Sequence, residues 1–277
     1  MSAQTDSRPA PDVHPRSELP PMARRNVLGM DLALTDYGGA MDWMDEVVRR
    51  RGRACVTAAA VHLVMVARED PEIRRAVDRA LAVPDGVPLV WALRALGHPE
   101  ASRVYGPDLM AAYCARSAVT GTTMFLYGGR SDEALATLTE ALLARYPGLR
   151  IVGGWSPPFR PLTAEEQDEV AARINASGAD VVWVGTGQPK QELWMANMRD
   201  RLEAPVLVGV GAAFDFHAGL VPQAPAWMQD YGLEWVYRLA QEPRRLWPRY
   251  ARYNPRFVAG FARQFARHRL SARAARR

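Results

Sequence analysis

The chain has 277 residues, 48% of them hydrophobic, which suits one large α/β domain or two small ones and excludes disorder throughout. No run of eighteen apolar residues occurs and the N-terminus is polar and proline-rich, so neither a membrane-spanning helix nor a secretory signal is predicted, and we expect a cytoplasmic protein. The net charge of +5 hides an asymmetry, because Arg238–Arg277 hold twelve arginines and one acid, about +11, against about −6 for the rest. The C-terminal end is therefore expected to meet an anionic partner.

Residues 1–24 are rich in proline, serine and aspartate and bury too little apolar surface to order themselves, so a disordered leader is predicted. Residues 25–233 then alternate short apolar or β-branched runs with segments of helical period. The expected strands are Val27–Leu34, Ala54–Thr57, Leu81–Val83, Thr123–Tyr127, Arg150–Val152, Asp180–Val184 and Pro205–Val210. Helices are expected over Asp132–Tyr146 and Ala164–Ser177, with Ser131 and Thr163 as N-caps.

This alternation is typical of βαβ units and predicts an α/β fold: a Rossmann-like, mostly parallel sheet with helices on both faces. In such sheets ligands bind at the carboxyl ends of the strands, so the loops after the strands are the places to look for chemistry. Cys55 and Cys114 lie in predicted buried segments without metal-ligand spacing and are interpreted as small core residues.

Residues 234–277 form a basic C-terminal appendage in which Glu234–Gln241 and Pro255–Arg269 are predicted helices. In the second helix Phe257, Phe261 and Phe265 recur every four residues and share one face, beside several arginines. A basic amphipathic helix of this kind suits the surface of an anionic membrane. The alternative is that the phenylalanines pack on the domain as ordinary core and the arginines form a solvated face.

A lone carboxylate follows the expected strand Leu81–Val83 in the segment PDGVP. Asp85 at the end of a strand, with Gly86 allowing close backbone approach, is placed to accept a proton from a substrate hydroxyl. The alternative is that Asp85 caps the following helix or makes a turn.

Two further loops could bind a ligand. Gly128 and Gly129 end one strand and open a helix, where backbone N–H groups can bind phosphate, although any tight turn also needs glycine. The loop GTGQPKQE, which contains Gly187, Lys190 and Gln191, is too polar to be explained by packing alone.

Neither a metal site nor a cofactor site is predicted. Asp215 and His217, in the loop after the last strand, lie two residues apart and need not be ligands, and no Asp-x-Asp motif or His/Cys cluster occurs. Because the sequence has no GxGxxG motif and no Walker lysine, a dehydrogenase or an ATPase is less favoured.

Six segments in one order resemble the WecG/TagA/CpsF glycosyltransferases over roughly residues 26–258: PDGVPLVWALRALG, RVYGPDLM, FLYGG, VGTGQPKQELWM, GVGAAFDFHAGLVPQAPAWMQDYGLEWVYRL and QEPRRLWPRY. The resemblance implies an inverting, metal-independent transferase that uses a UDP-sugar, typically UDP-N-acetylmannosamine, and no cofactor. It implies an undecaprenyl-diphosphate-linked sugar as acceptor, in the synthesis of teichoic acid or related surface glycans, and hence a peripheral place on the inner face of the cell membrane. Family members also tend to form homo-oligomers.

The resemblance also assigns site residues. It implies that Asp85 is the catalytic base and that Arg103 and Gln191 lie around the substrate pocket. Arginines of the appendage would neutralise the leaving diphosphate in place of a metal; the matching positions are Arg238, Arg244, Arg245 and Arg249.

One segment departs from the family pattern. Where a Thr-x-Asn motif is usual, this chain has VTAAAVH. Either Thr57 matches the threonine or, when Val61-His62 are aligned, an alanine takes its place, and the asparagine is absent in both alignments. This motivates an alternative, a catalytically weakened nucleotide-sugar-binding scaffold of a polysaccharide assembly complex. A nucleic-acid contact through the basic tail is disfavoured, because its arginines alternate with apolar residues at helical spacing and no nucleic-acid motif occurs.

Overall fold

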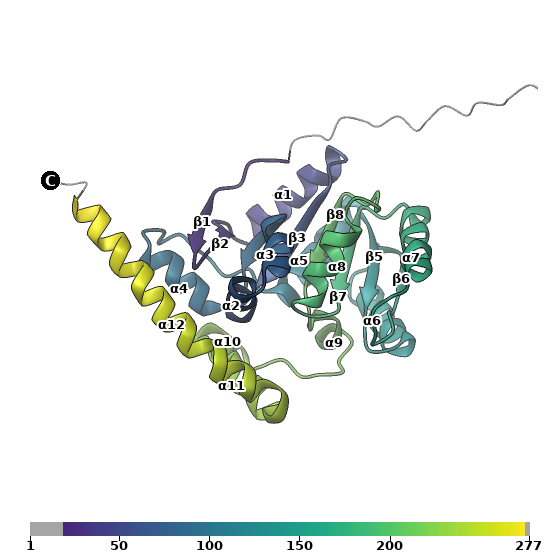
Figure 1. The fold of residues 1–277 in the computed structure, drawn as a ribbon. Helices are drawn as coiled ribbons and strands as arrows, with labels where there is room; N and C mark the ends of the chain where they lie inside the picture. Colours follow the sequence, from purple (N-terminus) through teal and green to yellow (C-terminus); the bar gives the residue numbers. More distant parts are fainter. Residues whose placement is uncertain (1–18, 275–277) are drawn as a thin grey trace, which may run out of the picture.

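The computed structural model describes residues 19–274 and contains one eight-stranded sheet (Figure 1). The strands lie in the order β1-β2-β4-β3-β8-β7-β5-β6, and all neighbours are parallel except β1 and β2. Their bounds are β1 Arg24–Val27, β2 Met30–Ala33, β3 Ala54–Ala59, β4 Ala80–Pro84, β5 Thr123–Gly128, β6 Arg150–Trp155, β7 Val181–Gly185 and β8 Val206–Gly209. The predicted α/β fold with a mostly parallel sheet is confirmed.

The N-terminal edge of the sheet differs from the sequence prediction. Instead of one strand over Val27–Leu34, β1 and β2 form an antiparallel hairpin in which Val27 pairs with Met30. The turn residues Leu28 and Gly29 have φ values of 52° and 98°, so the chain reverses where a continuous strand was expected. Most of the predicted leader, residues 1–18, lies outside the described residues, and Arg24 at its end already belongs to β1.

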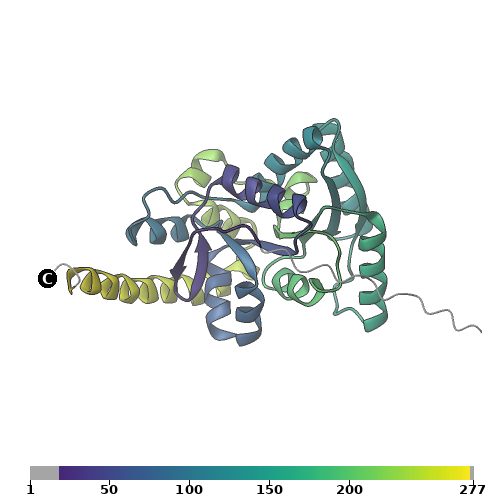
Figure 2. The same ribbon diagram turned by 90° about the horizontal axis from the view of Figure 1, so that it is seen from above.

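Helices cover both faces of the sheet (Figure 2). One face packs against α1 Tyr37–Arg49, α5 Gly106–Thr120, α6 Asp132–Arg145 and α9 Ala213–His217. The other packs against α2 Val61–Glu69, α3 Pro71–Asp78, α4 Val87–Ala95, α7 Ala164–Ser177 and α8 Lys190–Met198. Side chains alternate along β7: Trp183 faces the first layer, and Val182 and Val184 face the second. Ser131 and Thr163 cap α6 and α7 as predicted, and Cys55 and Cys114 are buried and free.

The C-terminal elements are α10 Ala226–Asp230, α11 Glu234–Gln241 and α12 Pro243–Ala274, which lies beside α2 and the β1–β2 hairpin (Figures 1 and 2). α12 is longer than the predicted Pro255–Arg269. It runs through Pro248 and Pro255, both on its exposed side, where water can hydrate the carbonyl groups that these residues leave unbonded. No helix among residues 19–274 is long and apolar enough to cross a membrane.

The phenylalanine stripe of α12 packs on the domain, as in the second of the two sequence interpretations. Phe257 is 5% exposed, and Phe261 and Phe265 lie half-buried against the cluster formed by β1, β2, α2 and α4. The stripe thus packs against the protein's own core, most completely at Phe257.

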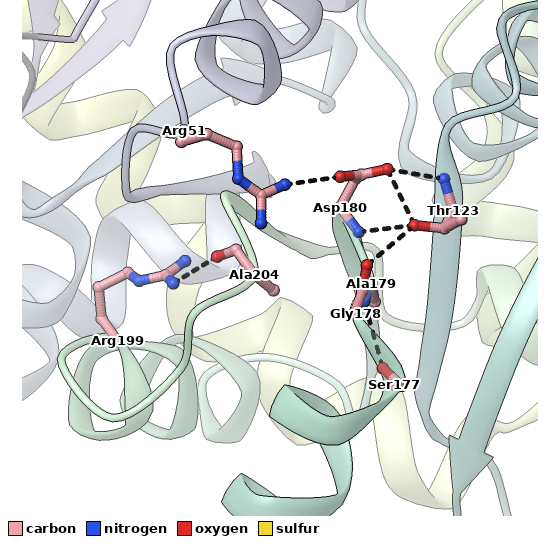
Figure 3. A network of polar contacts seen from close by, with 8 residues as sticks. All are labelled: Arg51, Thr123, Ser177, Gly178, Ala179, Asp180, Arg199 and Ala204. Carbon is pink, nitrogen blue, oxygen red and sulfur yellow. Dashed lines mark hydrogen bonds and ion pairs between the residues drawn. The ribbon is translucent and has the colours of Figure 1, made fainter. Parts of the chain in front are cut away.

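A polar network joins the amino ends of β5 and β7 (Figure 3). The Asp180 carboxylate accepts hydrogen bonds from the Thr123 N–H at 3.0 Å and hydroxyl at 2.8 Å, and its other oxygen pairs with Arg51 at 2.9 Å. Nearby, the buried Arg199 guanidinium donates to the carbonyl groups of Ala54, Leu202 and Ala204. These contacts fix the end of the sheet opposite to the loops that carry the candidate site.

Candidate active site

The carboxyl ends of the strands form the candidate site because the chain changes direction there. β3 is followed by α2 on one face, and its neighbour β8 is followed by α9 on the other. Helices that leave adjacent strands toward opposite faces open a crevice at the strand ends, which is where ligands bind in α/β sheets. Thr57 of β3 pairs with Gly209 of β8 at this point.

Asp85 leaves β4 at this edge, next to β3. Its backbone N–H bonds the Ala59 carbonyl at 3.0 Å, and its side chain is 20% exposed. The cap of α4 is Gly86, with no side-chain bond, so Asp85 does not cap the helix that follows it. Its carboxyl group instead takes a backbone hydrogen bond from Gly106, the first residue of α5.

An arginine and a second carboxylate surround Asp85. Arg103 donates from Nε to the Asp85 carbonyl oxygen at 2.6 Å, and its Nη2 lies 3.6 Å from the Asp85 carboxylate. The same Nη2 bonds Glu234 of α11 at 2.6 Å, and the Tyr105 hydroxyl donates to the other Glu234 oxygen at 2.9 Å. One guanidinium therefore serves two carboxylates, one from the sheet edge and one from the appendage.

This environment raises the pKa of Asp85 from 3.8 to about 7. Burial of the carboxyl group is the largest cause; the positive charge of Arg103 lowers the pKa and the negative charge of Glu234 raises it. An acid with a pKa near neutrality can hold or release a proton under physiological conditions, which is what a general base requires.

Thr57 and Gln191 are buried rather than open to a ligand. Thr57 is fully buried and donates its hydroxyl to Glu192 Oε1 at 2.6 Å. Gln191, 1% exposed, donates to the same oxygen at 2.9 Å and accepts from the Gly211 N–H at 3.0 Å. In this structure both residues hold the ends of β3 and β8 to α8, and their predicted contact with substrate remains a prediction.

The three glycines have different roles. Gly128, with φ of 140°, lies so close to β7 that a Cβ there would be 2.8 Å from the Gly185 backbone, so this glycine is required for packing. Gly129 and Gly187 have φ values of 100° and 81°, which favour glycine in their turns, and both are partly exposed at the strand ends. Their predicted contact with a phosphate through backbone N–H groups stays a prediction.

The appendage brings three of its four predicted arginines into one electrostatic cluster. The charge of Arg238 reaches Asp85, and Arg249 is half-buried. Burial lowers the pKa of Arg249, and the positive charges of Arg245 and Arg238 lower it further. Arg245 also pairs with Glu242. Arg244 is exposed in the first turn of α12, and the described residues show no contact that brings it into this cluster.

Residues 25–271 match the family model described as "Glycosyl transferase WecG/TagA/CpsF family". The chain belongs to this family. The match confirms the resemblance seen in the six motifs and extends it through most of α12, so the appendage is part of the glycosyltransferase rather than an addition to it.

Sequence reasoning missed two acidic residues of the candidate site. Glu192 is 1% exposed, its Oε2 has no hydrogen-bond partner, and burial raises its pKa, so it holds a proton more readily than an ordinary glutamate. It directly follows Gln191, and the polar loop was its only signal. Glu234 had none, because its partner Arg103 lies 131 residues away.

The site is narrow where the appendage meets the glycosyltransferase core. A cavity of about 10 Å³ lies between Phe216, Glu234 and Arg238, roughly room for one water molecule. Asp85 itself is reached only through its 20% exposed surface. Among residues 19–274, no group of three His, Cys, Asp or Glu side chains is placed to hold a metal ion.

Proposed function

We propose that this glycosyltransferase moves a sugar, an N-acetylhexosamine such as N-acetylmannosamine, from a UDP-sugar onto a polyprenyl-diphosphate-linked sugar, with inversion at the anomeric carbon. The observation that carries the proposal is the half-buried Asp85 carboxyl, with a pKa of about 7, at the carboxyl ends of the strands beside Arg103. A single base suffices for inversion, because one displacement exchanges the two bonds at the anomeric carbon.

In the proposed step the acceptor hydroxyl gives its proton to Asp85 as its oxygen attacks the anomeric carbon. The bond from that carbon to the UDP oxygen breaks, and the electron pair leaves with the diphosphate. The charge of Arg238 acts on Asp85, and Arg238 and Arg245 repel Arg249, so binding of an anion between these arginines would relieve their repulsion. No metal is needed for this charge balance, and the donor UDP-sugar is the only small molecule required.

Membrane contact through α10 and the start of the appendage is also part of the proposal. Trp227, Tyr231 and Trp247 are 57%, 72% and 63% exposed on α10, the loop after it and α12, and Trp247 lies one helical turn beyond the exposed Arg244. Exposed aromatic rings beside cations suit the interface of an anionic bilayer, where a lipid-linked acceptor is found. The membrane surface is thus proposed for these rings rather than for the packed phenylalanine stripe.

The test is UDP release in the presence of a lipid-linked acceptor. Asp85→Asn should lower turnover by about 10²–10⁴-fold while UDP binding is retained, because only the proton acceptor is lost. Asp108→Asn is the matched control: Asp108 is a nearby carboxylate that bonds the Tyr37 hydroxyl at 3.3 Å rather than Arg103. Equal losses in both variants would contradict the role of Asp85. UDP binding without turnover for any acceptor in the unaltered chain would favour the scaffold alternative.

The arginine cluster is tested by substitution, because removing α12 would also strip Phe257 from the core. Arg249→Gln should weaken UDP binding and lower turnover. Arg256→Gln, seven residues further along α12, removes the same charge from an exposed pair with Glu69 and should change neither. Unchanged UDP binding in Arg249→Gln would remove this residue from the proposed diphosphate site.

A further inference from the structure

A second basic site lies away from Asp85, between α12, the β1–β2 hairpin and the α2–α3 corner. An open groove of about 710 Å³ is present there, within the range of roughly 300–1,000 Å³ that small-molecule sites occupy. Its charged lining consists of four arginines and no acid: Arg68, Arg74, Arg263 and Arg267. These come from three separate helices, α2, α3 and α12, and converge on one space.

The two ends of the α2–α12 contact differ in charge balance. At one end Glu69 pairs with Arg252 at 2.7 Å and with Arg256 at 2.6 Å, so the cations of α12 meet an acid of α2. At the groove end Arg74 pairs with Asp78, but Arg68, Arg263 and Arg267 have no carboxylate partner among the side chains that the structure describes. Like charges held in one groove repel each other, and an anion between them removes that cost.

The walls of the groove are held in place by specific contacts. Gln264 of α12 forms two hydrogen bonds with the β1–β2 hairpin. Its Oε1 accepts from the Leu28 N–H at 2.9 Å, and its Nε2 donates to the Asn26 carbonyl at 2.8 Å. Gly260 allows the close approach, since a Cβ there would lie 3.3 Å from both Leu28 and the Arg68 guanidinium. The nearby start of α3 is already capped by Asp70, so the arginines are the donors that remain for a ligand.

We propose that this groove binds two or more phosphate groups at once, either on one molecule or on neighbouring lipid headgroups. Guanidinium groups present paired N–H donors that match phosphate oxygens, and several of them with no competing acid favour a multiply charged anion over a single carboxylate. Arg263 lies fourteen residues beyond Arg249, about 21 Å along the helix, so this site is separate from the cluster near Asp85. The inference is independent of the proposed transfer reaction. The phosphate groups belong either to lipid headgroups or to a soluble polyphosphate.

The experiment compares two double variants of the full-length protein. Arg263→Gln with Arg267→Gln removes two groove arginines, and Arg256→Gln with Arg269→Gln removes the same charge from the same helix outside the groove. Pyrophosphate binding is measured by calorimetry, and vesicle binding by flotation with phosphatidylglycerol or with phosphatidylcholine alone. The groove pair should bind about thirtyfold more weakly than the control pair, since each basic residue adds about one fivefold step near a phosphate surface. Arg68→Gln, on the opposite wall, should weaken binding in the same way.

Each outcome decides the proposal. Selective loss of pyrophosphate binding in the groove variants supports a soluble polyanion, and selective loss of phosphatidylglycerol binding alone supports a lipid headgroup. Equal losses in the groove and control pairs, or no binding of either probe by the unaltered protein, would overturn the site. UDP release during sugar transfer and the melting temperature should be unchanged in both pairs, because neither pair touches Asp85 or its arginine cluster, and this separates failure here from failure of the transferase proposal.

Discussion

Charged side chains at the two ends of the parallel sheet have different hydrogen-bond partners. At the amino end, Asp180 and Arg199 each bond several partners: the carboxylate contacts Thr123 and Arg51, and the guanidinium contacts four carbonyl groups. At the carboxyl end, Asp85 and Glu234 share one guanidinium, that of Arg103. Burial perturbs a charged group at both ends, lowering the pKa of Arg199 and raising that of Asp85. Arg199, however, bonds carbonyl groups of the fold, whereas Asp85 lies at the strand ends where ligands bind, so its raised pKa can serve chemistry.

The difference predicts which substitutions harm stability and which harm activity. Changes at the amino end should lower the free energy of unfolding. Changes at the carboxyl end should alter proton affinity and turnover while leaving the fold intact or more stable.

The largest effect on stability is expected for Arg199→Met. Arg199 is 5% exposed and bonds the carbonyl groups of Ala54, Leu202 and Ala204. The substitution leaves these buried acceptors without their donor and should lower the free energy of unfolding by about 3–5 kcal/mol. Urea unfolding measures this loss. Arg201→Met is the control, because Arg201 makes an exposed pair with Asp168 and should cost less than about 1 kcal/mol. Similar losses in both variants would contradict a structural role specific to Arg199.

Asp85→Asn should raise the free energy of unfolding rather than lower it. Because the folded-state pKa of Asp85 is raised from 3.8 to about 7, the native state binds this proton more tightly than the unfolded chain, and stability is lost as pH rises through that window. The neutral amide removes the cost, so the variant should gain on the order of 2–4 kcal/mol at pH 8 and almost nothing below pH 4. Thermal unfolding at both pH values checks it. A gain of the same size at low pH would show that charge is not the cause.

Glu234→Gln tests how the negative charge of Glu234, which shares Arg103 with Asp85, affects the pKa of Asp85. The negative charge of Glu234 raises the pKa of Asp85, and loss of that charge also frees Arg103 to interact with Asp85. The pH at which turnover reaches half its maximum should therefore fall, by about one unit. Glu242→Gln, in which the lost carboxylate pairs with Arg245 instead, should leave the profile in place. An upward shift in Glu234→Gln would reverse the assignment of these charges.

The sequence predicted the parts of the fold that depend on local pattern. The strands from Ala54 to Val210 and the caps Ser131 and Thr163 were found because apolar runs and capping residues act over a few residues. The hairpin at Leu28–Gly29 was missed because its turn lacks the usual Asn-Gly signal. α12 was cut short at Pro255 because local propensity ends helices at proline, whereas here packing of Phe257 on the domain prevails.

For the candidate site, too, the sequence predicted only what depends on local pattern. Asp85 could be found because it follows a strand, and its position at the sheet edge came with the fold. Its partner Glu234 could not, since no local pattern joins residues so distant in the chain. The burial of Thr57 and Gln191 against Glu192 likewise depends on how α8 packs under β3, which the motifs do not encode.

The smallest effect on stability is expected for Arg51→Gln. This variant shows which contacts of the amino-end network contribute to the free energy of unfolding. Arg51 is 63% exposed, so its pair with Asp180 is screened by water and should contribute less than about 1 kcal/mol. The bonds from Thr123 to the same carboxylate are half-buried and join two strands, so Thr123→Val should cost more. Urea unfolding of both variants at low and high salt separates the two contributions. A larger loss for Arg51→Gln than for Thr123→Val would mean that an exposed charge pair, rather than the hydroxyl and amide donors, fixes this end of the sheet.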